Sequence, residues 1–319
     1  MYTIGVDLGG TNIAVGVVGE DYKILGKASL KTHATREPVE IFRDMKKAAD
    51  IALEQAGAGW EQINWIGVGT PGTPNKDTGI IEFAGNLNFR NVPAVAMIEE
   101  IMNKKVYLEN DASCAAYGEF KAGAGRNYKS MVAITLGTGV GGGVILDGKI
   151  YSGYNFAGGE LGHMVIDING AECTCGRLGC WEAYASATAL IRQTKDAMRK
   201  DPDSYMWELV NKNIDLVNGR TSFDGMRAGD PAAKRVVDQY IYYLACGIIN
   251  TINIFQPELL CVGGGISKEG EILLAPVRKY VEHERFSVYA KRQTKIVAAE
   301  LGNDAGIIGA ALLGEQENL

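Results

Sequence analysis

The chain has only three histidines in 319 residues, and no apolar run in it is as long as a membrane span. The lack of such a run argues against a transmembrane protein and for a soluble one. Basic residues are not in excess, because 32 Lys and Arg stand against 38 Asp and Glu, and this net charge of −6 argues against a nucleic-acid-binding surface. The N-terminus shows no basic stretch followed by an apolar one, so we expect a cytoplasmic, reducing environment.

The common nucleotide-binding motifs are also missing. The sequence G-x-x-x-x-G-K-[ST] does not occur, which excludes a P-loop. A G-x-G-x-x-G spacing does occur at residues 137–142, but a dinucleotide fingerprint needs a helix directly after that loop. Residues 143–151 (GVILDGKIY) predict a strand and a turn, so a dinucleotide site is disfavoured.

Glycine is abundant, and its 41 residues gather in a few loops. Residues 4–18 (IGVDLGGTNIAVGVV) are echoed 128 positions later by residues 133–146 (AITLGTGVGGGVIL). Each copy predicts a β-hairpin with a turn rich in Gly and Thr. Because each hairpin opens about half of a chain with 46% hydrophobic residues, we expect two related domains that face one another.

A third glycine loop, at residues 261–267, follows an apolar strand at 258–262 and a long helical pattern at 231–255. Each loop alone is compatible with an ordinary tight turn, but exposed N–H groups and hydroxyls can also hold phosphate oxygens. The three together favour a nucleotide cleft between the domains. Asp7 ends an apolar strand, where it caps a turn or faces a magnesium ion that carries ATP phosphates, because a buried unpaired carboxylate is costly.

The segment from Glu160 to Glu182 contains a complete soft-ligand set. Three thiols and one imidazole within 18 residues suit a four-coordinate structural zinc; they belong to His163, Cys173, Cys175 and Cys180. Redox thiols or a disulfide are the alternatives, although a single intervening residue strains a bridge between the first two cysteines. The remaining cysteines have apolar neighbours and are interpreted as inert core residues; they are Cys114, Cys246 and Cys261.

Two polar loops follow predicted strands in the first half of the chain. Residues 105–109 predict a strand and 112–122 a helix, so Asn110 and Asp111 lie at the carboxyl end of a strand, where active sites collect in α/β sheets. Taken alone, Asp111 is better explained as a helix cap. Asn86 lies in the loop at 83–88 and is either an ordinary turn residue or part of the site.

Six motifs spanning nearly the whole chain resemble those of one family: D7-L-G-G-T, E109-N-D, L136-G-T-G-V-G-G-G, G158-G-E-L-G-H, C173-T-C-G-R-L-G-C-W-E and G263-G-G-I-S. In this order they are similar to the ROK family of bacterial sugar kinases, and most similar to its glucokinases. The resemblance implies an α/β, actin-like (ribonuclease H-like) two-domain ATPase fold, with an interdomain cleft and a structural zinc loop.

The resemblance further implies ATP-dependent phosphorylation of glucose at its 6-hydroxyl to give glucose 6-phosphate, with Asp111 as general base. The implied cofactors are ATP, Mg²⁺ and structural Zn²⁺. The implied sugar contacts are Asn86, Asn110, Asp111, Glu160, His163 and Glu182. The implied phosphate and nucleotide contacts are Asp7, Gly9, Gly10, Thr11, Gly137, Thr138, Gly139, Gly263, Gly264 and Gly265.

Several alternatives stay open. Other kinases of the family act on N-acetylmannosamine, N-acetylglucosamine, allose or fructose. Some relatives are sugar-responsive repressors that carry an N-terminal helix-turn-helix, whereas this chain starts at its first strand. The zinc loop disfavours a further alternative, a phosphatase or ATPase of the same superfamily.

The resemblance also guides the expected domains and assembly. We expect a smaller domain of residues 1–118 plus 301–319, and a larger one of 119–300 that holds the zinc loop and a helical insert at 201–221. Trp207 in this insert either packs on its own domain, which is the favoured interpretation, or faces a partner. A homodimer or homotetramer is expected, with no nucleic-acid or membrane partner.

Overall fold

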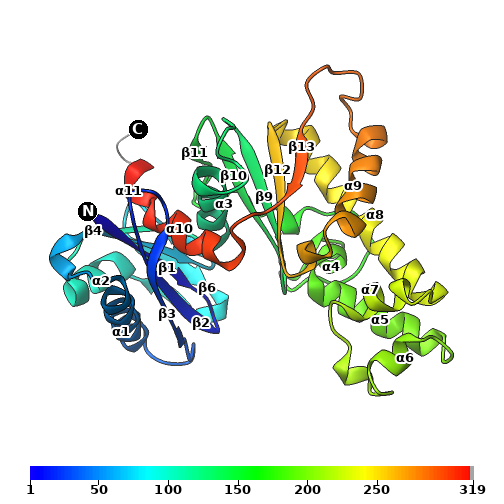
Figure 1. Ribbon diagram of the computed structural model, residues 1–319, viewed down its shortest axis with the longest axis horizontal. Helices are drawn as coiled ribbons and strands as arrows, with labels where there is room; N and C mark the ends of the chain where they lie inside the picture. The colour runs from blue at the N-terminus through cyan, green and yellow to red at the C-terminus, as the bar shows by residue number, and fades with distance from the viewer. Residues whose placement is uncertain (317–319) are drawn as a thin grey trace. The chain divides into compact units, whose positions relative to one another are not determined.

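The computed structural model describes residues 1–316 and divides into two compact units (Figure 1). The first comprises Met1–Ala133, Gly143–Gly159 and the chain from Glu300 onward; the second comprises Ile134–Gly142 and Glu160–Ala299. The predicted boundary after Gly118 assigns residues 119–133 and 143–159 to the other side of the division, so the predicted domain limits stay a prediction.

The first unit is built on a five-stranded sheet of order β3-β2-β1-β4-β8. Its strands are β1 (Tyr2–Leu8), β2 (Asn12–Val18), β3 (Ile24–Lys31), β4 (Ile63–Thr70) and β8 (Val106–Asn110). The predicted hairpin is confirmed, because β1 and β2 pair antiparallel with Gly5 opposite Gly16. β4 and β8 then run parallel to β1, and the carboxyl ends of all three therefore lie at the same edge of the sheet.

Two helices pack on this sheet for different reasons. α1 (Pro38–Ala56) has proline in its first turn and ends at Gly57 in the left-handed conformation, and its apolar face covers β2 and β3 (Figure 1). α10 (Ala305–Ala311) packs on β1, β4 and α3 (Asp111–Ala122). Only glycine allows this approach, because a Cβ on Gly67 would lie 1.7 Å from the backbone oxygen of Ala310.

A small antiparallel sheet lies between β4 and β8 in the sequence. It consists of β5 (Thr73–Asn75), β6 (Ile80–Ala84) and β7 (Phe89–Val92), and it is followed by α2 (Ala94–Met102). A short 3₁₀ turn (Gly85–Leu87) that contains Asn86 joins β6 to β7. β5 packs against β8, so the β5–β6 turn lies beside the strand that leads to Asp111.

The second five-stranded sheet repeats the order of the first, β11-β10-β9-β12-β13. Its strands are β9 (Met131–Leu136), β10 (Val140–Leu146), β11 (Lys149–Ile150), β12 (Leu259–Gly264) and β13 (Lys295–Ala298). As in the first sheet, an antiparallel pair lies at one side (β10–β11) and a parallel pair at the other (β12–β13). The internal repeat in the sequence is therefore a repeat of topology.

Most helices belong to the second unit. They are α4 (Glu182–Ala185), α5 (Ala187–Lys200), α6 (Met206–Leu209), α7 (Thr221–Arg227), α8 (Pro231–Phe255) and α9 (Glu271–Glu284); α11 (Leu313–Gln316) lies in the first unit. α8 has the predicted bounds, and the Asp230 side chain caps it by accepting from two backbone N–H groups. Trp207 packs within its own unit, where its indole donates to the backbone oxygen of Met198.

Within residues 1–316, no helix is both long enough and apolar enough to span a bilayer.

Candidate active site and metal centre

The turn from β8 into α3 presents Asp111 at the start of a helix. Asn110 performs the capping: its Oδ1 accepts the backbone N–H groups of Ala112 at 2.9 Å and Ser113 at 3.1 Å, and its Nδ2 donates to the oxygen of Gly72 at 3.3 Å. Helix capping by Asn110 weakens the alternative in which Asp111 is merely a cap. Asp111 also accepts the N–H of Ala112, at 2.8 Å.

Two carboxylates at this edge of the sheet have raised pKa values. Burial raises the pKa of Asp111, although hydrogen bonds from the backbone and from Asn110 oppose the shift. Burial also raises the pKa of Asp7 to about 6, with the negative charge of Asp111 as the next cause and Lys27 acting in the opposite direction. A pair of partly buried acids near one another fits a site that receives a cation or a proton.

The Gly9–Thr11 loop and Asn86 approach each other closely. The backbone N–H of Gly9 donates to the oxygen of Asn12 at 2.9 Å, which closes the turn between β1 and β2. A Cβ on Gly10 would lie 2.8 Å from the backbone oxygen of Asn86, so glycine is needed here. Asn86 and Thr11 are both exposed. The first unit therefore brings Asn86 next to the glycine turn that follows Asp7 on β1.

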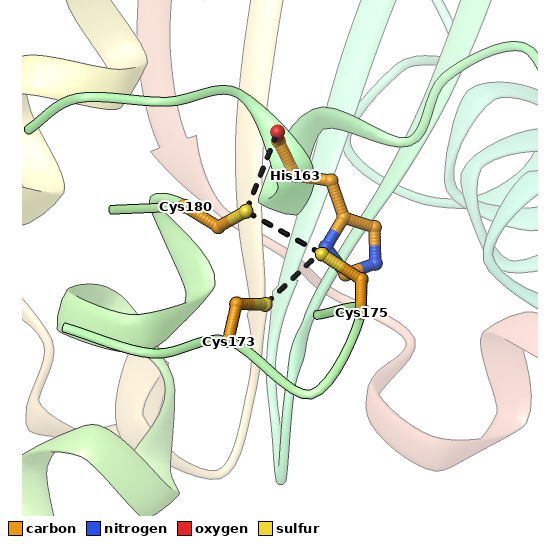
Figure 2. Close-up of side chains that lie close together, drawn as sticks. All are labelled: His163, Cys173, Cys175 and Cys180. Carbon is orange, nitrogen blue, oxygen red and sulfur yellow. Dashed lines mark hydrogen bonds between the residues drawn. The ribbon is translucent and has the colours of Figure 1, made fainter. Parts of the chain in front are cut away.

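The four predicted metal ligands of the second unit converge. The ligand atoms of His163, Cys173, Cys175 and Cys180 all lie within 4.8 Å of one another, and their side chains point toward a common centre (Figure 2). Cys173 Sγ lies 3.6 Å from His163 Nδ1, and Cys175 Sγ lies 3.6 Å from Cys180 Sγ.

These separations decide between a metal site and a disulfide. A tetrahedral zinc, with bonds of about 2.3 Å to sulfur and about 2.0 Å to nitrogen, separates its ligand atoms by roughly 3.5–3.8 Å. A disulfide needs about 2.05 Å between sulfurs. The donor set of three sulfurs and one nitrogen therefore fits zinc, with every position filled by protein, as in a structural site. Burial and the neighbouring thiols raise the pKa of Cys180 to about 12, so at neutral pH this thiol loses its proton only when a metal ion displaces it.

His163 presents its two ring nitrogens to different groups. Nδ1 faces Cys173, whereas Nε2 lies 3.9 Å from Glu160 Oε2. Both residues lie on one short 3₁₀ turn, in which the N–H of His163 donates to the oxygen of Glu160 at 3.1 Å. The histidine therefore links the thiol cluster to the Glu160 carboxylate, as expected of a ligand whose second nitrogen stays available for another contact.

Glu182 begins α4 and is held on both of its oxygens. Oε2 accepts the backbone N–H of Val140 at 3.0 Å, and Oε1 accepts the Thr174 hydroxyl at 3.1 Å. The preceding residue, Trp181, is fully buried and donates to the oxygen of Tyr243 on α8 at 2.9 Å. Glu182 therefore connects the cysteine loop to the loop that precedes β10, and Trp181 anchors both to the core.

The two glycine loops of the second unit lie together. The Gly137 oxygen accepts the N–H of Ala187 at 2.8 Å, which ties that loop to the start of α5. Gly264 has a left-handed φ of 86°, and a Cβ there would lie 2.4 Å from the backbone oxygen of Leu136. β10 begins at Val140, where a dinucleotide site would need a helix. Thr138, Gly264 and Gly265 are exposed.

Three residues near these groups were missed by sequence reasoning. Thr174 holds Glu182, while Lys76 and Ser152 both bind Glu109 next to Asn110. The position of Thr174 between two ligand cysteines was a usable signal. Lys76 and Ser152 lie in loops with no motif, and only the folded chain brings them to Glu109.

Comparison with known proteins now decides the family. The model of the ROK family matches residues 3–317. The chain belongs to the ROK family. It is 40% identical over 310 residues to a glucokinase of Thermotoga maritima, which covers 97% of this chain and 95% of that protein.

A solved ROK family glucokinase from Streptomyces griseus, in complex with glucose and AMPPNP, is similar in structure as well. Its TM-score is 0.85 at 34% identity, over 99% of this chain and 100% of that one. A regulator is similar to the chain as well: a xylose repressor of Caldicellulosiruptor bescii is 28% identical over 96% of this chain and 76% of the repressor. The fold is therefore the α/β, actin-like fold that the sequence motifs implied.

Proposed function

We propose that this ROK protein transfers the γ-phosphoryl group of ATP to the 6-hydroxyl of glucose, giving glucose 6-phosphate and ADP. The observation that carries the proposal is the similarity, over nearly the full length of both chains, to a glucokinase. The site geometry supports it, because a partly buried carboxylate follows a strand of the first unit and a fitted metal-ligand set lies in the second.

Asp111 is the proposed general base. Its burial raises the pKa of the carboxyl, which makes it a stronger base than an exposed aspartate once it is ionised. The proton of the 6-hydroxyl moves to Asp111 as the sugar oxygen bonds to the γ-phosphorus and the bond to the ADP oxygen breaks. Phosphoryl transfer otherwise needs alignment and charge neutralisation more than covalent chemistry, and the remaining proposed residues serve those ends.

Asp7 is the residue that would hold magnesium, directly or through water. Burial and the negative charge of Asp111 both disfavour the ionised form of Asp7. A bound cation would offset this effect, so the Asp7 carboxylate suits a metal ion. When bound, Mg²⁺ would neutralise the phosphate oxygens of ATP. The turn residues are proposed to hold the phosphates and the nucleotide through backbone N–H groups and the Thr hydroxyls; they are Gly9, Gly10, Thr11, Gly137, Thr138, Gly139, Gly263, Gly264 and Gly265.

Sugar hydroxyls are the proposed ligands of the remaining polar residues. Glu160, His163 and Glu182 belong to the segment that the thiol cluster organises. Zinc held by His163 and the three cysteines would fix this segment and leave His163 Nε2 for a hydroxyl. Asn86 and Asn110 are proposed as further contacts, together with Asp111 itself.

We also propose a cytoplasmic homodimer or homotetramer, with the domain limits 1–118 plus 301–319 and 119–300, on the strength of the family resemblance. Light scattering coupled to size-exclusion chromatography measures the assembly. Limited proteolysis followed by mass spectrometry locates the domain limits.

The test is a sugar panel with Mg–ATP, in which ADP release is measured and the new phosphate is located by ³¹P NMR. We expect glucose to be preferred and phosphorylated at the 6-hydroxyl. A site that binds hydroxyls rejects analogues leaving its polar groups unpaired, by a factor that reaches about 10⁴. Preference for N-acetylmannosamine, N-acetylglucosamine, allose or fructose overturns the substrate but keeps the kinase. Sugar binding with no phosphorylation of any hexose indicates a regulator.

A further inference from the structure

An ion pair between the buried Glu109 and the more exposed Lys76 lies next to the Asn110–Asp111 turn. Glu109 is the last residue of β8 before that turn, and its side chain is only 3% exposed. Its Oε2 accepts Lys76 Nζ at 3.0 Å and the Ser152 hydroxyl at 2.7 Å. Lys76 Nζ also donates to Ser152 Oγ at 2.9 Å, so the three side chains form a closed triangle.

The second oxygen of Glu109 points toward the proposed catalytic turn. Glu109 Oε1 accepts the backbone N–H of Asn110 at 2.9 Å. Asn110 then caps α3 through its side chain, and Asp111 is the first residue of that helix. The Glu109 carboxylate therefore fixes the peptide from which both Asn110 and Asp111 project.

The network joins three separate segments of the first unit. Lys76 lies in the turn between β5 and β6, Glu109 on β8, and Ser152 just after β11. The Asn110 side chain adds a fourth link, through its bond to the oxygen of Gly72 at the start of the same β5–β6 hairpin. A buried carboxylate is tolerated only when its partners satisfy it, and here one cation and two further donors do so.

We propose that Lys76, Glu109 and Ser152 form a positioning network that sets the orientation of the Asp111 carboxylate for proton removal. The inference rests on the proposed function, in which Asp111 is the base. None of the three residues belongs to the predicted sugar, phosphate or metal contacts. Their role is geometric, since a displacement of about 1 Å in a reacting group can cost about 100-fold in rate.

The chemistry of the pair provides a rescue experiment. In Glu109→Gln, the amide can still accept the N–H of Asn110, but its NH₂ group faces Lys76, which is also only a donor. In Lys76→Met, Glu109 keeps its charge without a cation. The double variant Lys76→Met/Glu109→Gln removes both faults, because the amide NH₂ can donate to Ser152 Oγ.

The experiment compares these three variants with wild type and with Lys23→Met, which removes the lysine of an exposed ion pair with Asp21. Glucose phosphorylation is measured well below each melting temperature, and amide hydrogen exchange is followed at residues 110–113. We expect both single variants to lose about 10-fold to 100-fold in kcat. Glucose and ATP KM should stay within about threefold of wild type, and the turn should exchange faster. The double variant should recover most of the lost kcat and most of the exchange protection at residues 110–113. The Lys23→Met control should match wild type in both measurements.

Unchanged kcat and exchange in both single variants overturn the proposal. A loss of kcat that the double variant does not recover also overturns the proposal, because the ion pair then only stabilises the fold. If wild type itself phosphorylates no hexose, the proposed function fails. The exchange measurement still decides whether the network holds the turn, so the two failures are told apart.

Discussion

The two groups of proposed site residues are held in place by different means. Asp7 lies near the end of β1 and Asp111 directly follows β8, so the strand ladder and a helix cap fix the backbone there. The segment from Glu160 to Glu182 has little regular structure: a 3₁₀ turn and two isolated bridges, Val165 with Cys180 and Glu172 with Leu178. There, four converging metal ligands and the buried Trp181 replace the ladder.

Because the two regions are held differently, different perturbations should disturb them. The geometry of the first region depends on backbone hydrogen bonds and on the Glu109 network, so it should persist without metal. If zinc occupies the converging ligands, the geometry of the second region should depend on it as a unit. Turnover and sugar affinity should therefore be separable by substitution.

The largest expected effect is that of Asp111→Asn. The amide keeps the shape of the side chain but cannot take a proton, so kcat should fall by about 100-fold to 10,000-fold. Glucose affinity should change little, because the amide still forms hydrogen bonds. Steady-state kinetics with glucose and Mg–ATP measure the loss. Near-normal turnover would show that Asp111 is only a structural residue of the turn.

Asp7→Asn tests how much the buried charge of Asp7, next to Asp111, destabilises the folded protein in the absence of Mg–ATP. The folded-state pKa of Asp7, about 6, lies above its ordinary value of 3.8, so the folded state binds the proton more tightly. The charge therefore destabilises the fold above pH 6, and this penalty disappears as the pH falls from 6 toward 3.8. Replacing the charged Asp7 with Asn at pH 7 should therefore raise the free energy of unfolding by up to about 3 kcal/mol.

Denaturant unfolding of wild type and Asp7→Asn at several pH values, without nucleotide, measures this effect. The stability gain should shrink toward zero as the pH approaches 4, whereas Mg–ATP affinity should fall at neutral pH. Parallel pH profiles for the two proteins would contradict the assigned burial of Asp7.

Cys175→Ser tests the second region. Wild type should contain about one zinc per chain by metal analysis, and the variant should lose it together with about 10-fold to 100-fold in glucose affinity. Cys246→Ser is the matched control, since Cys246 is a partly buried thiol outside the ligand set. Folded, active wild type without zinc would refute the structural metal.

Thr174→Val should give the smallest effect. It removes the hydroxyl that donates to Glu182 Oε1 but leaves the neighbouring ligand cysteines intact. The loss of one such hydrogen bond should raise the KM for glucose by about twofold to tenfold with zinc content unchanged. Thr174→Ser, which keeps the hydroxyl, should resemble wild type; equal KM values for both variants would show that Glu182 needs no such support.

Sequence reasoning succeeded where local pattern controls structure. The β1–β2 hairpin and α8 were predicted because apolar periodicity and turn residues act over short distances. The convergence of His163 with three cysteines was predicted because all four lie within one short segment, and it is confirmed.

The parts that were not predicted depend on long-range packing. Glu109 meets Lys76 and Ser152 across 33 and 43 residues, and no spacing rule connects them. Asn110, not Asp111, caps α3, a choice that depends on backbone angles absent from the sequence. The close approach of Gly67 to Ala310 likewise appears only in the folded chain.

The most direct test of the separation between the two regions is calorimetric titration of glucose into Asp111→Asn and into Cys175→Ser, beside wild type. We predict that Asp111→Asn binds glucose within a few-fold of wild type while its turnover is lost, and that Cys175→Ser binds glucose much more weakly. Loss of glucose binding in Asp111→Asn, or unaltered binding in Cys175→Ser, would contradict the assignment of the base to the first region and of the zinc-dependent sugar contacts (Glu160, His163 and Glu182) to the second.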